Sequence, residues 1–117
     1  MALEIIEKDS GGVTILVLSG RVTLGDASQQ LRTKLKEVLS RGQTRMVLDL
    51  ANVGHIDSAG LGTLVAGYSS ARNEGAAIKL ANLTKKFHEQ LNITKLVTVF
   101  EVYNTVDEAL KSFAPAS

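Results

Sequence analysis

The sequence predicts an α/β fold, in which a mixed β-sheet is opened by a hairpin and continued through crossover α-helices. Apolar runs rich in β-branched residues alternate with segments whose apolar residues recur at helical spacing. Only turn residues separate the first pair of runs, whereas helix-length segments separate the later ones. A chain of 117 residues, 44% of them hydrophobic, suits one compact core, so we expect a single domain over residues 1–117.

The first strands and the first helix follow from local patterns. Residues 3–7 and 13–18 are strand-like, and the Asp-Ser-Gly-Gly of residues 9–12 between them is typical of a tight turn. We then expect a helix with Asp26 as its N-cap and Gly42 at its end. Its apolar face comprises Ala27, Leu31, Leu35, Val38 and Leu39.

The remainder of the chain continues the alternation. Residues 45–51 form an apolar strand, and the helix that follows ends at Gly75. The apolar stripe of this second helix comprises Leu61, Leu64, Val65 and Tyr68. The last expected elements are a strand at 77–81, a helix at 84–91, a strand around 99–103 and a final helix opened by the capping box Thr105 to Glu108.

Composition argues against several classes of function. The net charge is +1 and aromatic residues make up 4%, so we expect no direct contact with nucleic acid. No apolar run approaches the about 20 residues of a membrane span, and the N-terminal sequence does not resemble a secretion signal. With no cysteine, we expect a cytoplasmic protein without cofactor. No familiar metal spacing is formed by Asp49, His55, Asp57 and His88.

Ser58 is the candidate functional residue, and a nucleophilic role is the least favoured one. A nucleophile elbow needs Gly at both positions two residues from its Ser; Gly60 fits this pattern but Ile56 does not. A triad also needs a His as base, and the chain offers only His55 and His88, neither in a recognisable arrangement. We therefore expect no enzymatic activity.

A helix cap and a modification site remain as interpretations of the segment 53–64, Val-Gly-His-Ile-Asp-Ser-Ala-Gly-Leu-Gly-Thr-Leu. Asp57, followed by Ser58 just inside the first turn, can accept an amide hydrogen bond that would otherwise be unmade, which is worth about 1 kcal/mol. The start of a helix also presents amide donors and the positive end of the helix dipole. A phosphate on Ser58 would therefore be tolerated there.

The face of the second helix opposite its apolar stripe carries only small residues. Such a face is unusual, because a solvent-facing helix normally carries long charged side chains and avoids Gly. It indicates either close packing within the fold or a docking site for a partner, and the pattern does not separate these two. Ser58 stands at the rim of this face, which comprises Ala59, Gly62, Thr63, Ala66, Gly67 and Ser70. Phosphorylation would add about −1.5 to −2 charge at that rim.

Four segments together resemble the STAS domain of bacterial anti-sigma factor antagonists. They are Asp-Ser-Ala-Gly-Leu-Gly at 57–62, Val-Leu-Asp-Leu at 47–50, Lys-Leu-Ala-Asn at 79–82 and Leu-Asn-Ile-Thr-Lys-Leu at 91–96. The resemblance runs from about residue 3 to residue 113 and includes the order of the expected elements. It implies that Ser58 is phosphorylated by a cognate anti-sigma factor that is itself a serine kinase, and that a serine phosphatase reverses the modification. The unmodified form would bind the anti-sigma factor and free a sigma factor; the phosphorylated form would release it.

The resemblance also implies where the partner binds. Many members carry Gly-Glu-Leu-Asp after the second strand, whereas residues 20–23 of this chain are Gly-Arg-Val-Thr. Arg21 in place of an acid bears on kinase recognition, and fits either a different partner or an ion pair with a phosphate on Ser58. The expected partner-binding residues are Asp57, Ser58, Ala59, Gly60, Gly62, Thr63 and Ala66 of the helix start, with Arg21, Thr23 and Asp26 of the loop.

STAS domains also occur as subunits of stress-sensing scaffolds and lipid-transport complexes. In that alternative the small face packs permanently on another protein, and Ser58 does not act as a switch. The presence of an intact Ser58 in a short, separate chain favours the switching hypothesis.

Overall fold

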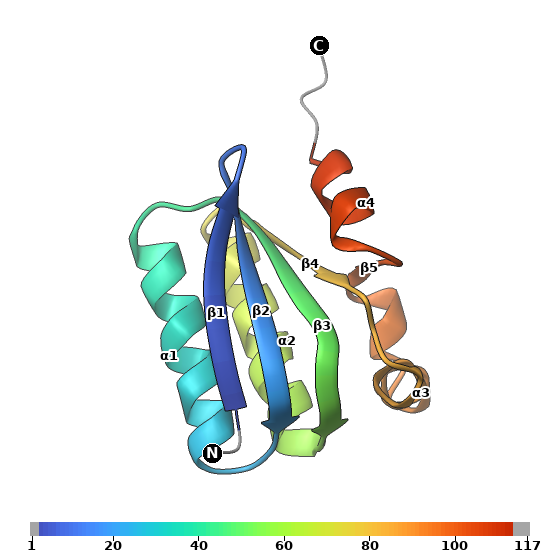
Figure 1. Ribbon diagram of the computed structural model, residues 1–117. Coiled ribbons are helices and arrows are strands. Elements are labelled where there is room, and N and C mark those ends of the chain that lie inside the picture. Colours follow the sequence, from blue (N-terminus) through green and yellow to red (C-terminus); the bar gives the residue numbers. More distant parts are fainter. Residues whose placement is uncertain (1–2, 114–117) are drawn as a thin grey trace.

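The computed structural model describes residues 3–113, which form one five-stranded sheet flanked by helices (Figure 1). The strands lie in the order β1-β2-β3-β4-β5; β1 and β2 are antiparallel and the other neighbours are parallel. The elements are β1 Leu3–Ser10, β2 Val13–Val22, α1 Asp26–Ser40, β3 Arg45–Ile56, α2 Ser58–Asn73, β4 Ala77–Ala81, α3 Lys85–Ile93, a 3-10 helix Leu96–Thr98, β5 Glu101–Tyr103 and α4 Val106–Lys111. The predicted α/β class, with its opening hairpin and crossover helices, is confirmed.

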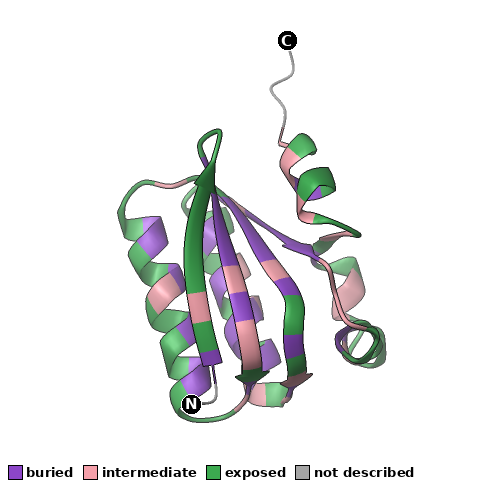
Figure 2. Ribbon diagram, viewed as in Figure 1, coloured by how far each residue is buried: buried purple, intermediate pink, exposed green. Residues whose placement is uncertain are grey.

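Helices cover the two faces of the sheet unequally. The main core lies between the sheet and α1, α2 and α3, and Figure 2 shows the buried residues of β2, β3, α1 and α2. The short helix α4 packs on the opposite face, where its Ala109 joins a smaller cluster with Val13, Ile15, Val47 and Ala81. Alternate residues of a strand point to opposite faces, so the same strands supply both clusters.

The hairpin forms where the turn residues predict it. Gly11 and Gly12 have φ values of 57° and 86°, and the residues on either side, Ser10 and Val13, pair with each other. A hairpin turn with positive φ at both central positions matches the twist of its strands and favours Gly.

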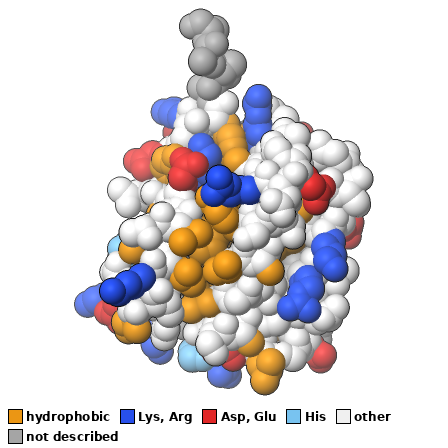
Figure 3. Space-filling model, turned by 180° about the vertical axis from the view of Figure 1, so that it is seen from behind, with side chains coloured by type: hydrophobic (Ala, Val, Ile, Leu, Met, Phe, Trp, Pro, Cys, Tyr) orange, Lys and Arg blue, Asp and Glu red, His pale blue; other side chains and the backbone are white. Residues whose placement is uncertain are grey.

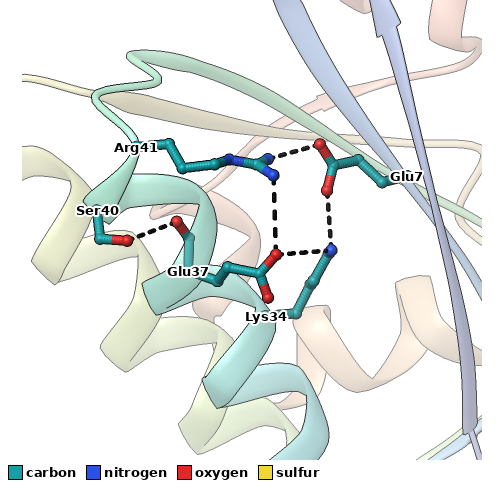
Figure 4. Close-up of polar contacts among 5 residues, drawn as sticks. All are labelled: Glu7, Lys34, Glu37, Ser40 and Arg41. Atoms are coloured by element: carbon teal, nitrogen blue, oxygen red, sulfur yellow. Dashed lines mark hydrogen bonds and ion pairs between the residues drawn. The ribbon is translucent and has the colours of Figure 1, made fainter.

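An ion-pair network joins β1 to α1 (Figure 4). One carboxylate oxygen of Glu7 lies 2.8 Å from Nζ of Lys34, and the other contacts the guanidinium of Arg41. Glu37 completes the network at 3.3 Å from Lys34 Nζ, and its carbonyl oxygen accepts a hydrogen bond from Ser40 Oγ at 2.8 Å. β1 is an edge strand, and this network links it to α1 in the helical layer.

The apolar stripe of α2 is buried along one side only. Leu61 and Leu64 are buried, whereas Val65 and Tyr68 are half-buried at the margin of the core. The Tyr68 ring meets Phe100 edge-on, with ring centroids 5.2 Å apart. Figure 3 shows the helical side of the molecule, where hydrophobic side chains gather in the middle with basic side chains to either side.

The structure corrects the expected end of β3. This strand extends to Ile56, whereas the apolar pattern predicts its end at residue 51. The extension continues the parallel pairing with β2, in which Arg21 lies opposite His55 and Val22 opposite Ile56. Asn52 and Gly54 interrupt the apolar pattern there, so pairing with the neighbouring strand, which is not visible locally, maintains the strand.

The expected cap of α1 is also wrong. Asp26 is the first helical residue rather than the N-cap, and no side chain makes a capping hydrogen bond at this end. The N-cap is Gly25, whose φ of 100° lies in a region that favours glycine. In place of a side-chain cap, the carbonyl of Thr23 accepts hydrogen bonds from both the amide and the hydroxyl of Ser28, at 3.1 and 2.7 Å.

Candidate functional site

The start of α2 is fixed by one carboxylate that makes contacts in two directions. Asp57 is the N-cap, as predicted, and its Oδ1 accepts a hydrogen bond from the Gly60 amide at 2.9 Å. Its Oδ2 accepts a second hydrogen bond, from the Leu24 amide in the β2–α1 loop, at 3.0 Å. Asp57 therefore joins the helix start to a loop that is 33 positions away in the sequence.

The same contacts set the ionisation of Asp57. The Gly60 amide, followed by the Leu24 amide, holds the pKa of this carboxyl below its ordinary value, against a smaller opposing effect of burial. The Ala59 amide and the charge of His55 act in the same direction as the first pair. The carboxylate is thus ionised over the neutral range, with both oxygens occupied as acceptors.

Close packing places this helix start against the end of β2. A Cβ added at Gly60 would lie 2.2 Å from the carbonyl oxygen of Val22 and 2.9 Å from Ile56 Cγ1. The same Val22 carbonyl accepts a hydrogen bond from the Asp57 amide at 3.3 Å. Gly60 is buried, so its role in the site is to permit this approach and not to present a surface.

Ser58 is the first residue of α2 and is exposed. It follows the capping Asp57 directly, so its side chain is available at the helix start while the cap is supplied by its neighbour. Its position just inside the first turn is the one that the sequence predicts.

A groove between α1 and α2 runs from the site along both helices. The part nearest the start of α2 is lined by Leu24, Gly25, Ser28, Gln29, Arg32, Ala59, Gly62 and Thr63. Its second part shares Arg32 and Thr63 and continues over Leu35, Lys36, Leu39, Ala66, Gly67 and Ser70. Arg32 and Lys36 are the charged residues among these lining positions, so the groove is basic.

The small face of α2 is closely packed on α1 at one residue and open at others. A Cβ added at Gly67 would lie 2.5 Å from Leu35 Cδ1, which indicates close packing of α1 against α2. Around Gly62 nothing lies within 4 Å of the added Cβ, and Ala66 is exposed. Thr63 is buried, and its hydroxyl donates to the Ala59 carbonyl at 3.1 Å.

The three loop residues expected at the site, Arg21, Thr23 and Asp26, are not among the residues that line the α1–α2 groove. Arg21 is exposed at the end of β2, and Thr23 is half-buried. Asp26 is exposed and lines a second hollow with Ile5 of β1 and with Gln29, a residue that also lines the α1–α2 groove. Leu24 was not among the residues expected at the site. Its sequence context could have indicated it, because it is an apolar residue in the turn Thr-Leu-Gly-Asp and belongs to no apolar helical stripe.

Fold and site together define the class of protein: a small α/β domain whose candidate site is a surface hydroxyl at a helix start, beside an open basic groove. Within residues 3–113, no cluster of three or more His, Cys, Asp or Glu side chains is placed to hold a metal ion. None of the helices in that same range is long and apolar enough to span a bilayer.

The chain belongs to the STAS domain family, whose sequence model matches residues 4–109. The anti-sigma F factor antagonist of Paenibacillus polymyxa is 28% identical over 111 residues, which cover 94% of each chain. The anti-sigma-B factor antagonist of Listeria monocytogenes is 28% identical over 112 residues, covering 92% of this chain and 93% of the relative. An anti-sigma factor antagonist from Mycobacterium paratuberculosis has the same fold, with a TM-score of 0.83 at 23% identity over 95% of this chain and 93% of that one.

Proposed function

We propose that this chain is an anti-sigma factor antagonist that acts by partner switching, with Ser58 as its phosphoacceptor. In this proposal the unmodified form binds an anti-sigma factor that is also a serine kinase, and a sigma factor is thereby released. Phosphorylation of Ser58 ends the interaction, and a serine phosphatase restores it. The protein itself is a binding partner in the cytoplasm and not an enzyme.

The observation that carries the proposal is the position of Ser58. It is exposed, it opens α2, and it stands beside the groove whose lining includes Ala59, Gly62 and Thr63. A kinase can reach this hydroxyl, and a partner seated in the groove would contact it. The family membership and the names of the relatives, which are anti-sigma factor antagonists, support the same function.

Electrostatics favour an effect on binding over an effect on folding. A phosphate at the start of α2 gains about 0.3 to 2 kcal/mol from the helix terminus, and repulsion from the Asp57 carboxylate opposes this gain. Within the domain these effects offset each other. Across an interface, a phosphate dianion facing an apolar or acidic surface costs several kcal/mol, and every ~1.4 kcal/mol changes the affinity tenfold.

A binding experiment tests the proposal. The probe is the purified anti-sigma factor from the host genome that binds the wild-type chain, titrated calorimetrically. We expect Ser58→Asp to weaken binding at least about tenfold while changing the free energy of unfolding by less than about 1 kcal/mol. The matched control is Ser69→Asp, because Ser69 is exposed on the same helix but does not line the groove. Equal affinities of Ser58→Asp and wild type would contradict the proposal.

Intact-mass measurement on protein from the native host tests the modification itself. We expect one phosphate on the wild-type chain and none on Ser58→Ala. A phosphate that persists in Ser58→Ala would move the acceptor to another hydroxyl, such as Thr23 or Thr63. A complex that copurifies unchanged whatever the phosphorylation state would instead support a permanent scaffold subunit.

A further inference from the structure

Leu24 is an exposed apolar side chain at the candidate site. It is 79% exposed, more than any other large hydrophobic residue in the part of the chain that the structure describes. A single exposed leucine is ordinary and needs no explanation by itself. The position of Leu24 is what distinguishes it, because it lines the α1–α2 groove near the start of α2, together with Ala59 and Gly62.

The backbone that carries Leu24 is held from both sides. The Leu24 amide donates to Asp57 Oδ2 at 3.0 Å. The carbonyl of the preceding Thr23 accepts two hydrogen bonds from Ser28, and the following Gly25 turns the chain into α1. The leucine is therefore presented by a loop whose conformation is fixed before binding. Pre-organisation of this kind lowers the entropic cost of association, and buried apolar anchors carry much of the energy of protein interfaces.

We infer that Leu24 is the apolar anchor of the docking surface, with Asp57 as the positioning residue that holds it. The inference rests on the proposed function and names the chemistry of its partner. The anti-sigma factor would offer an apolar pocket for Leu24 and an acidic surface to the groove, whose charged lining residues are Arg32 and Lys36. A phosphate on Ser58, at the rim of this groove, would repel that same acidic surface.

The two acceptor oxygens of Asp57 allow its two tasks to be separated. Asparagine caps helices as well as aspartate does, but it has one acceptor oxygen and one NH₂ group. In Asp57→Asn the side-chain oxygen can still accept the hydrogen bond from the Gly60 amide. The NH₂ group that replaces the second oxygen cannot accept a hydrogen bond from the Leu24 amide. We expect faster hydrogen exchange at the Leu24 amide with little change at Gly60. A merely structural role of Asp57 as a cap would leave both amides unchanged.

Binding by Leu24 variants tests the anchor, with the same purified anti-sigma factor as probe. We expect Leu24→Ala to weaken binding about 10- to 100-fold. Leu24→Met, which keeps a large apolar side chain, should retain most of the wild-type affinity. The matched control is Ile93→Ala, since Ile93 is 75% exposed at the end of α3 and does not line the groove. Thermal unfolding of every variant should match wild type.

The outcomes separate this inference from the proposed function. If Ser58→Asp weakens binding but Leu24→Ala binds like wild type, the anchor is wrong and the phosphorylation switch stands. If Leu24→Ala weakens binding and Ile93→Ala weakens it equally, the effect is not specific to the site and the anchor is again wrong. If the wild-type chain binds none of the anti-sigma factors of its host, both fail together.

Discussion

Gly67 of α2 faces Leu35 of α1 so closely that a Cβ on the glycine would lie 2.5 Å from Leu35 Cδ1. Leu35 is buried, so its terminal methyl group would have to shift from its packed position to admit the added atom. We expect Gly67→Ala to destabilise the fold by about 1 to 3 kcal/mol through overpacking, despite the better helix propensity of alanine. Chemical denaturation measures the change. Unfolding at the wild-type denaturant concentration, or above it, would contradict this packing.

Gly62 provides the opposite case on the same helix. Nothing lies within 4 Å of a Cβ placed there, and its φ lies outside the positive range. We expect Gly62→Ala to stabilise the fold by about 0.5 to 1 kcal/mol, since alanine is the better helix former. Gly62→Gln should fold as well and yet weaken binding of the anti-sigma factor, because its side chain would occupy the groove. A stable Gly62→Gln variant with wild-type affinity would place the docking surface elsewhere.

Local patterns in the sequence were sufficient to predict most of the fold. The apolar face of α1 is buried at each expected position, including Leu31 and Leu35. Apolar residues recur at helical spacing because one face of the helix must pack on the core. The cap at Asp57 was predictable for the same reason, since it depends on residues within one turn. Spacing within one helix or one turn therefore predicted these features, although the same local reasoning placed the cap of α1 wrongly at Asp26.

Contacts between distant segments set the limits of sequence reasoning. The Asp57–Leu24 hydrogen bond spans 33 positions, and no local pattern indicates it. The extension of β3 to Ile56 likewise depends on pairing with β2. The sequence alone could not show which small residues of α2 are closely packed and which are open. Gly67 lies against Leu35 of α1, whereas nothing lies within 4 Å of a Cβ added at Gly62.

The Glu7 network of Figure 4 should contribute modestly to stability, and its contribution should depend on salt and pH. Lys34, followed by Arg41, lowers the pKa of Glu7, so the stabilisation is present above the ordinary carboxyl pKa and is lost as pH falls through the lowered value. We expect Glu7→Gln to cost about 0.5 to 1 kcal/mol at low salt and less at high salt. Glu4→Gln, on the opposite face of β1, is the control and should change nothing measurable. A Glu7→Gln effect that is independent of salt would assign it to packing.

Acidification should disconnect the Leu24 loop from the start of α2. The Gly60 and Leu24 amides lower the pKa of Asp57 in the folded state, so its stabilising contacts are present above the unfolded value and are lost as pH falls through the lower folded value. An NMR titration should show the Asp57 carboxyl and the Leu24 and Gly60 amides changing together, with one midpoint below the ordinary aspartate value. A midpoint at or above that value would show that the two amides do not stabilise the carboxylate.

Lys79 of β4 should hold α4 against the sheet. Its side chain is largely buried, and its Nζ donates to Ser112 Oγ at 2.7 Å and lies 4.1 Å from the centroid of the Phe113 ring. Lys79→Met keeps an apolar stem of similar length and removes the ammonium group. We expect it to destabilise the fold by about 1 kcal/mol and to speed hydrogen exchange within α4 but not within α2.

The control for this prediction is Lys111→Met, because Lys111 pairs with Asp107 in an exposed i,i+4 ion pair on α4 itself, at 3.2 Å. Such surface pairs contribute little, so this variant should leave exchange in α4 nearly unchanged. The comparison separates anchoring of α4 from its intrinsic helix stability: the buried ammonium acts between layers, whereas the exposed pair acts along the helix. If Lys111→Met speeds exchange in α4 as much as Lys79→Met does, the helix is limited by its own propensity, and Lys79 does not anchor it.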